Sequence, residues 1–290
     1  MQAFLVDGTY ELFRAFYGSP PQTNSTGIEI GATISFTRSM LGLIRGQNVT
    51  HIGCAFDHVI ESFRNEIFPA YKSSNGIDPL ILAQFDWVER AAQACGIPIW
   101  PMVEVEADDA LATAAARLRE DRRVGQVVIC TPDKDLAQCV RGNRVICLNR
   151  RAQNFMNEQG VKEKFGVLPA SIPDWLALVG DSADGIPGIP GWGAKSSSRI
   201  LAYYRHLEKI PDYASSWDVS VRGADRLSVN LRQQREDAIL YRMLATLRED
   251  SAIDCSVEDL EWRGVPRDLF EKLVSDLEEP ELLEAVPRWA

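Results

Sequence analysis

Nine carboxylates occupy positions from which folding could bring them into one crevice. Asp7, Asp57 and Asp133 each end or follow a short apolar run of the kind that forms a buried strand. The remaining six stand at residues 106–109, 133–135 and 181–184, and are Glu106, Asp108, Asp109, Asp135, Asp181 and Asp184. Because this set offers only carboxylate oxygens, it suits the hard cations Mg²⁺ and Mn²⁺ rather than zinc or iron.

Carboxylates a few ångströms apart raise one another's pKa and destabilise a fold unless positive charge lies among them. Divalent cations supply that charge, and two of them about 4 Å apart can stabilise the attacking and leaving oxygens of a phosphoryl displacement. The pattern therefore predicts nuclease chemistry at a site with two ions. For single segments a structural explanation stays open, because capping and turn chemistry also favour acids after strands and at helix starts.

Basic and aromatic side chains follow the second acidic strand closely. As a set, Arg64, Tyr71 and Lys72 fit contacts to a nucleic acid. Arg64 or Lys72 would stabilise charge on the scissile phosphate and join Asp133 in the catalytic set, while Tyr71 could stack an unpaired base. Taken singly, each of these residues is more typical of a surface loop.

A turn rich in glycine and proline, residues 185–195, opens directly into a helical pattern. Glycines let a backbone approach phosphate closely, and exposed amides at a helix start favour anions. The segment predicts a helix-hairpin-helix contact with a sugar-phosphate backbone that is independent of base sequence. An ordinary connecting loop is the alternative. The expected contact residues are Gly188, Gly191, Gly193, Lys195, Ser196 and Arg199.

The elements that must position these residues alternate between strand and helix in the first part of the chain. Strands are expected at residues 3–7, 51–57, 96–100, 127–133 and 144–148, and helices at 32–44, 80–95 and 108–120. Such alternation predicts a mostly parallel sheet covered on both faces, with Asp7, Asp57 and Asp133 at the carboxyl edge of its strands. After the first strand, Gly8 is expected to begin a loop.

Strand signals fade beyond about residue 166. Helices are expected at residues 172–179, 194–206, 227–249 and 267–277. The chain is therefore predicted to form an α/β domain over residues 1–166 and a helical domain over 167–290, with the hairpin element at about 172–206.

Length and composition exclude several classes of protein. The 290 residues correspond to about two domains, and 46% hydrophobic residues are typical of a globular protein. Six scattered cysteines without a CxxC pair argue against a zinc or redox motif. No apolar stretch is long enough for a bilayer and no signal peptide is evident, so a cytoplasmic location without membrane contact is expected.

The net charge of −10 by itself argues against a nucleic-acid partner. If the nine clustered acids are left out, however, the chain has 31 basic and 32 acidic residues. The excess of negative charge is therefore interpreted as a metal-binding cradle.

Together these motifs resemble the 5′→3′ exonuclease and flap endonuclease family, which occurs at the amino end of bacterial DNA polymerase I and as free-standing phage and bacterial enzymes. The segments that carry the resemblance are residues 6–8 with Arg14, 56–57, 62–72, 106–109, 131–135 and 180–195. They cover about residues 3 to 205 and are jointly specific to this family.

The resemblance implies a PIN-like α/β catalytic domain followed by a helical domain with a helix-three-turn-helix element. It implies two metal sites, with Asp133 shared between them: the first also has Glu106, Asp108 and Asp109, and the second also has Asp135, Asp181 and Asp184. Asp7 and Asp57 would act directly or through water. An arch at about residues 73–100 would pass a 5′ single strand, and K⁺ is a further candidate at the glycine turn.

The resemblance also implies products, substrates and partners. Hydrolysis would leave a 5′-phosphate and a 3′-hydroxyl, in primer removal or DNA repair. The partner would be DNA with 5′ ends, flaps or branches, including RNA-DNA primers, and the chain would be a monomer. Arg14 would contact the nucleic acid.

Two segments depart from the family pattern. Residues 73–76, Ser-Ser-Asn-Gly, stand where the family often has a basic residue, and Arg90 is the one basic residue between 73 and 100. After Lys195, two serines replace the family's Thr-Ala. Two alternative functions stay open: a non-catalytic, structure-selective DNA-binding module, and a PIN-like endoribonuclease.

Overall fold

The computed structural model describes residues 1–290 and divides into two compact units. The first unit comprises residues 1–62, 74–131 and 249–290, and the second comprises residues 63–73 and 132–248. The sequence assigned residues 249–290 to the helical domain, whereas in the structure they belong to the first unit.

The first unit is built on a parallel sheet. Its strands are β1 (Gln2–Asp7), β2 (His51–Asp57), β3 (Ile99–Met102) and β4 (Gln126–Cys130), in the order β3-β2-β1-β4. Asp7 pairs in register with Ala55, and Asp57 pairs with Met102. Both aspartates therefore lie at the carboxyl edge of the sheet, and the predicted mostly parallel arrangement is confirmed.

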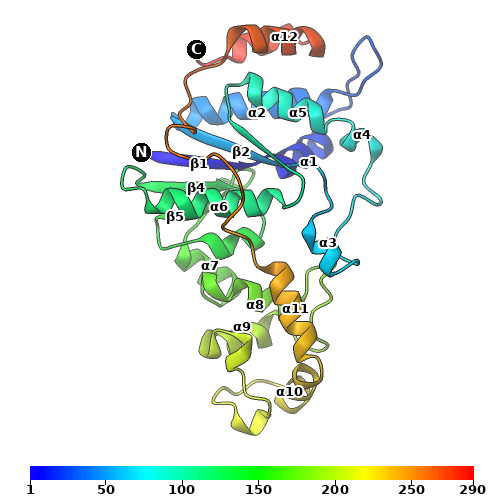
Figure 1. Cartoon of the computed structure of the whole chain (residues 1–290), viewed down its shortest axis with the longest axis vertical. Coiled ribbons are helices and arrows are strands. Elements are labelled where there is room, and N and C mark those ends of the chain that lie inside the picture. Colours follow the sequence, from blue (N-terminus) through cyan, green and yellow to red (C-terminus); the bar gives the residue numbers. More distant parts are fainter. The chain divides into compact units, whose positions relative to one another are not determined.

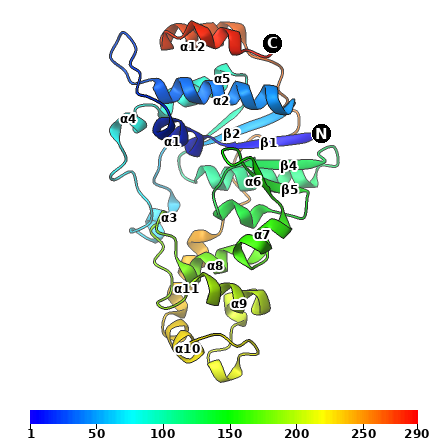
Figure 2. The ribbon, with the colours of Figure 1, turned by 180° about the vertical axis from the view of Figure 1, so that it is seen from behind.

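Helices cover both faces of this sheet. The helices of this unit are α1 (Gly8–Gly18), α2 (Gly31–Gln47), α4 (Pro79–Leu82), α5 (Phe85–Ala94), α6 (Ala107–Glu120) and α12 (Arg267–Leu277), followed by a short 3-10 helix, η5 (Pro280–Ala285). Figures 1 and 2 show α2 and α5 on one side of β1 and β2 and α6 on the other, with α12 packed beyond α5. The predicted α/β layering is confirmed.

Helix α1 replaces the loop expected at Gly8, so that expectation was wrong. The Asp7 side chain accepts a hydrogen bond from the Tyr10 amide at 2.9 Å and so caps the helix directly after the strand. A side chain at position 8 would not fit, because a Cβ there would lie 2.4 Å from the Phe56 ring. The glycine therefore allows an immediate strand-to-helix transition.

Two expected helices are each divided in the structure. Residues 80–95 form α4 and α5, and between them the Gln84 side chain accepts hydrogen bonds from the Thr33 amide and hydroxyl, both at 2.9 Å. Residues 227–249 form α10 (Ala224–Gln233) and α11 (Arg235–Ala245), which meet at Gln234. Neither break contains proline or glycine, so helical periodicity alone did not reveal it.

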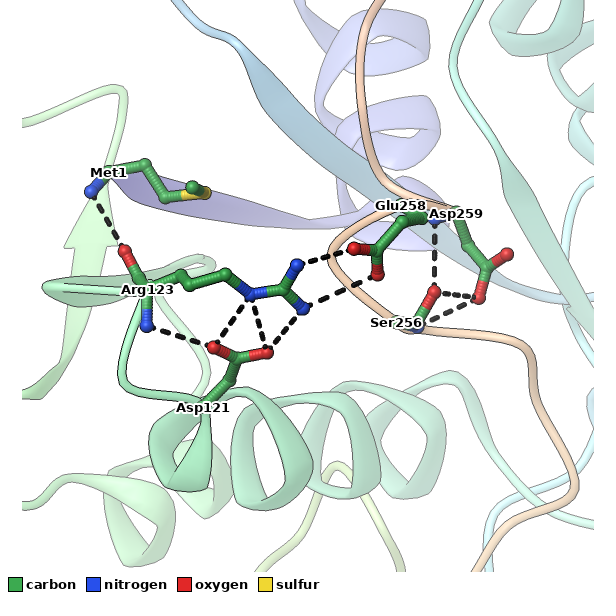
Figure 3. A network of polar contacts seen from close by, with 6 residues as sticks. All are labelled: Met1, Asp121, Arg123, Ser256, Glu258 and Asp259. Carbon is green, nitrogen blue, oxygen red and sulfur yellow. Dashed lines mark hydrogen bonds and ion pairs between the residues drawn. The ribbon is translucent and has the colours of Figure 1, made fainter.

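The carboxyl-terminal segment is tied to the sheet of the first unit. The Ile52 amide donates to the Leu260 carbonyl at 2.9 Å, and the Trp262 indole donates to the Cys95 carbonyl at 2.9 Å. Figure 3 shows Arg123, just before β4, donating to Asp121 and to Glu258 of this segment. The α-amino group of Met1 donates to the Arg123 carbonyl at 3.1 Å. Chain segments far apart in sequence thus close one edge of the unit.

The second unit is mainly helical. Its elements are the antiparallel pair β5 (Val145–Asn149) and β6 (Asn154–Met156), helices α3 (Phe63–Ile67), α7 (Glu158–Phe165), α8 (Ile172–Val179), α9 (Ala194–Tyr204), α10 and α11, and the 3-10 turns η1 (Asp135–Cys139), η2 (Pro169–Ser171), η3 (Leu207–Lys209) and η4 (Ala214–Ser216).

A buried aspartate holds three of these elements together. Asp174 on α8 is almost fully buried and accepts hydrogen bonds from the Leu207 amide at 3.1 Å and from His206 at 3.0 Å. Arg242 on α11 pairs with the same carboxylate at 3.3 Å. The helical part of the predicted fold is confirmed. No helix in the chain is both long and apolar enough to cross a bilayer.

Candidate metal centre and nucleic-acid interface

Three aspartates of the second unit form a compact carboxylate cluster. The closest oxygens of Asp135, Asp181 and Asp184 all lie within 4.8 Å of one another. Asp135 begins η1, while Asp181 and Asp184 stand in the turn after α8. That turn closes on itself through paired backbone hydrogen bonds of 2.8 Å between Asp181 and Ile186, so its two aspartates face the same cluster.

The cluster is electrostatically unfavourable in the absence of a cation. Burial, and then the negative charges of the neighbouring aspartates, raise the pKa of Asp135 well above its ordinary value. One oxygen of this carboxylate, Oδ1, is buried without a hydrogen-bond partner. Asp133 lies beside it, and its Oδ1 accepts a hydrogen bond from the Asp135 amide at 2.8 Å. An oxygen-only donor set with an unsatisfied buried oxygen fits a divalent cation.

Two lysines partly neutralise this cluster. The Lys134 ammonium lies 2.6 Å from Asp181, and the Lys72 ammonium lies 3.9 Å from Asp184. Burial acts to lower the pKa of Lys134, but the hydrogen bond to Asp181 and the charges of nearby carboxylates raise it overall. Sequence reasoning had missed Lys134, although its position between two aspartates was the available signal. Four carboxylates against two ammonium groups leave a net negative site.

A second group of carboxylates lines the edge of the first unit's sheet. Asp7 accepts a hydrogen bond from the Thr131 hydroxyl at 2.9 Å, and Asp57 accepts one from the Ala107 amide at 2.8 Å. Glu106 accepts one from the Ser62 hydroxyl at 2.8 Å. All three carboxylates are buried, and neutral donors hold their orientation.

The two aspartates at the start of α6 have different surroundings. Asp109 is fully buried and accepts a hydrogen bond from the Glu106 amide at 3.0 Å, which is a capping interaction. Asp108 is only half-buried. Of the predicted set, the structure brings Asp135, Asp181 and Asp184 within 4.8 Å of one another, with Asp133 beside them. The first-unit acids stand at the ends of β1 and β2 and at the start of α6, where Asp57 is linked to Ala107 and Glu106 to Asp109 by hydrogen bonds.

Arg64 has a structural environment in the second unit. It is 1% exposed, and its guanidinium donates to the carbonyls of Leu244 at 2.8 Å and Thr246 at 3.2 Å. The same group stacks over the Phe63 ring. Arg64 therefore connects α3 to the end of α11.

Two other expected contact residues also have protein partners. Tyr71 is 5% exposed, so its ring has little surface on which a base could stack. Arg14 forms an ion pair with Glu11 and donates to the Ser39 hydroxyl at 2.8 Å, and its side chain remains partly exposed.

The glycine-rich turn forms a hairpin between α8 and α9. Gly188 has a φ of +72°, and a Cβ there would lie 2.6 Å from the Gly180 amide nitrogen, so this glycine serves close backbone packing. Gly191 and Gly193 are exposed. The Gly193 amide donates to the Ser196 hydroxyl at 3.1 Å at the start of α9. Farther along that helix, Lys195 and Arg199 are exposed.

Helix α10 is joined to the hairpin by two hydrogen bonds. The Asn230 side chain donates to the Pro190 carbonyl at 2.6 Å, and the Trp192 indole donates to the Leu227 carbonyl at 3.1 Å. These two hydrogen bonds fix the loop that carries the exposed Gly191 and Gly193. Neither contact was expected from the sequence, because both link segments about 35 to 40 residues apart.

Charge is distributed unequally between the two units. The second unit carries 19 basic and 14 acidic residues, and the first carries 12 basic and 27 acidic residues. The unit that contains the hairpin is therefore net positive, even with four clustered aspartates included. The global charge of −10 consequently does not argue against a polyanionic partner for this unit.

Part of the expected arch belongs to the core of the first unit. Helix α5 lies within residues 73–100, and its Val88, Ala91 and Ala92 are completely buried. A passage for a single strand would therefore have to use a shorter segment than residues 73–100, before α5.

Comparisons with known proteins identify relatives along nearly the whole chain. Residues 2–166 match the family model described as 5′-3′ exonuclease, N-terminal resolvase-like domain, and residues 167–268 match that described as 5′-3′ exonuclease, C-terminal SAM fold. A 5′-3′ exonuclease of Aquifex aeolicus is 31% identical over 98% of this chain and 95% of its own length.

DNA polymerase I of Pseudomonas aeruginosa is 36% identical over 91% of this chain. This chain spans 29% of the length of that polymerase and 32% of the one from Bacillus subtilis.

Solved structures share the fold at low sequence identity. A structure of the T5 D15 protein co-crystallised with metal ions has a TM-score of 0.68 and 19% identity, and the match covers 96% of this chain and 99% of that one. The catalytic core of Rad2 in complex with DNA substrate has a TM-score of 0.63 and 16% identity, and the match covers 99% of this chain and 92% of that one.

Proposed function

The chain belongs to the 5′-3′ exonuclease family, and from this premise we propose that it is a divalent-metal-dependent 5′→3′ exonuclease and structure-specific flap endonuclease acting on DNA. The observation that carries the proposal is the cluster of Asp135, Asp181 and Asp184, with its buried, unsatisfied oxygen. A protein without a cation partner for these groups would gain no stability from gathering them.

Mg²⁺ or Mn²⁺ is the proposed cofactor, with two ions for catalysis. Asp133, Asp135, Asp181 and Asp184 would hold one ion, and Glu106, Asp108 and Asp109, with Asp133, would hold the other; Asp7 and Asp57 would assist directly or through water. Bound ions of this kind activate water and stabilise negative charge on phosphoryl oxygens. We therefore propose that cleavage depends on these carboxylates.

The lysines would have separate roles. Lys72 lies 3.9 Å from Asp184 and still exposes part of its side chain, so its ammonium can contribute positive charge to a bound phosphate. Lys134, at 2.6 Å from Asp181, keeps that carboxylate in place. Because the Arg64 guanidinium donates to backbone carbonyls and Tyr71 is buried, we assign both to structure and leave them out of the catalytic and stacking sets.

The second unit would bind the sugar-phosphate backbone of a duplex through its hairpin. Its net positive charge, the exposed Gly191 and Gly193, and the exposed Lys195 and Arg199 support this role. The proposed substrates are DNA 5′ ends, flaps and branches, including RNA-DNA primers, cut by a monomer. Bound K⁺ at the glycine turn is part of the proposal, and replacing K⁺ by Na⁺ should then weaken duplex binding.

The function is tested by mapping products on 5′-labelled flap, nicked and blunt duplexes with Mg²⁺ and with EDTA. We expect cleavage only with the metal, and fragments that carry a 5′-phosphate and a 3′-hydroxyl. Intact duplex binding without cleavage at any Mg²⁺ concentration would instead indicate a non-catalytic DNA-binding module. Preferential cleavage of an all-RNA hairpin would indicate an endoribonuclease.

A further inference from the structure

A groove of about 460 Å³ lies between α7, α8 and α9 of the second unit. Figure 2 shows these three helices next to one another. Three cationic residues line the groove: Lys164 from α7, and Lys195 and Arg199 from α9. No acidic residue lines it. In a chain with ten more acidic than basic residues, an unopposed group of three cations favours an anionic ligand.

Helix α7 is fixed against α9 by close packing. Gly166 ends α7 with a φ of +72°, and a Cβ at this position would lie 2.8 Å from the Ser198 Cβ. The Ser198 hydroxyl accepts a hydrogen bond from the Trp175 indole at 3.0 Å and donates to the Phe165 carbonyl. The last turn of α7, with Lys164, is therefore held at a defined position beside α9.

The groove has the chemistry of a surface for a nucleic-acid backbone. The Lys164 ammonium lies 4.9 Å from the centre of the Phe165 ring, which limits the conformations of its side chain. The three cations are exposed and presented by two helices, whereas a pocket for a small ligand would enclose it. Two of them stand on the helix that follows the hairpin, so the groove and the hairpin are connected through α9.

We infer that this groove extends the hairpin's contact with the phosphodiester backbone of duplex DNA onto α7, where Lys164 supplies an additional phosphate contact. The inference rests on the proposed DNA-binding function, and it adds an element outside the glycine-rich motif. The recognised chemistry is the spaced phosphates of one duplex strand. Binding in the groove is expected to be independent of base sequence, because lysine and arginine contacts to phosphates carry no sequence information.

The test compares Lys164→Ala with Lys162→Ala in the full-length chain. Lys162 stands on the same helix but outside the groove, and pairs with Glu158 at 3.2 Å. Duplex affinity is measured by fluorescence anisotropy in EDTA, where cleavage is blocked, over about 50 to 200 mM salt. Loss of one phosphate contact should lower the slope of log affinity against log salt by about 0.9, with a several-fold loss of affinity. Lys162→Ala should match the wild type.

Duplex length gives an independent readout. On duplexes shortened until they reach only the hairpin, Lys164→Ala and the wild type should bind equally, and Lys164→Arg should restore binding to long duplexes. Thermal melts of the variants confirm that they are folded. Equal binding by Lys164→Ala and Lys162→Ala at every length, or no duplex binding by the wild type, would overturn the inference. A wild type that binds duplexes with this Lys164 dependence but never cleaves them would refute the nuclease proposal alone.

Discussion

Replacing Asp135 by asparagine should stabilise the metal-free protein and remove most of its response to Mg²⁺. Burial and neighbouring aspartates raise the pKa of this carboxyl in the folded state. The folded chain therefore holds the proton more tightly than the unfolded chain, and ionisation of Asp135 costs stability as the pH rises above the unfolded pKa of about 3.9. The cost reaches its full value above the raised folded pKa. Asparagine removes it.

The size of the effect follows from the geometry of the cluster. Two like charges 4.8 Å apart repel by about 3.5 kcal/mol at an effective dielectric constant of about 20. Asp135 faces Asp181 and Asp184 at or below this separation and also has Asp133 beside it, and the nearby ammonium of Lys134 offsets a smaller part of the repulsion. After relaxation we expect a gain of about 1 to 3 kcal/mol, which corresponds to roughly 3 to 10 °C in Tm.

Magnesium should stabilise the wild type more than the Asp135→Asn variant. At about 100 times its Kd, a ligand that binds only the folded state adds about 2.7 kcal/mol, so the wild-type Tm should rise by roughly 5 to 10 °C. Asp135→Asn should lose most of this increase, because it removes one ligand and one charge.

Thermal melts followed by circular dichroism and tryptophan fluorescence, with EDTA or Mg²⁺ at about pH 7.5, measure both effects. Asp237→Asn is the matched control, since this exposed carboxylate on α11 belongs to the same unit; its melts should follow the wild type. An unchanged or lower metal-free Tm for Asp135→Asn, together with a preserved Mg²⁺ response, would show that the cluster is not a cation site.

Three further substitutions test separate parts of the proposal. Asp133→Ala should abolish Mg²⁺-dependent cleavage of a labelled flap while duplex affinity stays within about twofold; surviving turnover would remove Asp133 from the metal set. Lys195→Ala should weaken duplex binding and lower the salt slope by about 0.9, and an unchanged slope would exclude it from the phosphate contacts. Arg64→Met should lower the free energy of unfolding by about 2 to 4 kcal/mol in urea denaturation, because the carbonyls of Leu244 and Thr246 lose their donor. A loss below about 0.5 kcal/mol would contradict the structural role given to Arg64.

The strands and the acids at their ends could be predicted from the sequence for a physical reason. A strand of a parallel sheet is buried on both faces, so it reads as a continuous apolar run, and Asp7 and Asp57 mark the ends of such runs. The cluster of Asp181 and Asp184 was accessible because its residues are close in sequence. These features depend on local pattern alone.

Other features depend on contacts between distant segments, which local pattern does not encode. The sequence around Arg64 predicts a phosphate contact, whereas its hydrogen bonds to the carbonyls of Leu244 and Thr246, which support a structural role, depend on a segment about 180 residues away. Tyr71 is an aromatic residue beside a basic one, and its burial is decided by packing. Helix α1 was missed because Gly8 was interpreted as the start of a loop, whereas in the structure Asp7 caps a helix that begins at this glycine.

The return of residues 249–290 to the first unit has a consequence for how the protein is made on the ribosome. The Trp262 indole bonds to Cys95, Arg45 bonds to the Ala285 carbonyl, and Arg117 bonds to the carbonyls of Ser251 and Ile253. During synthesis, the first unit therefore lacks these contacts until the ribosome has translated the second unit and residues 249–290. The second unit ends at residue 248, so it can fold before the first unit, although synthesis of the first unit begins earlier.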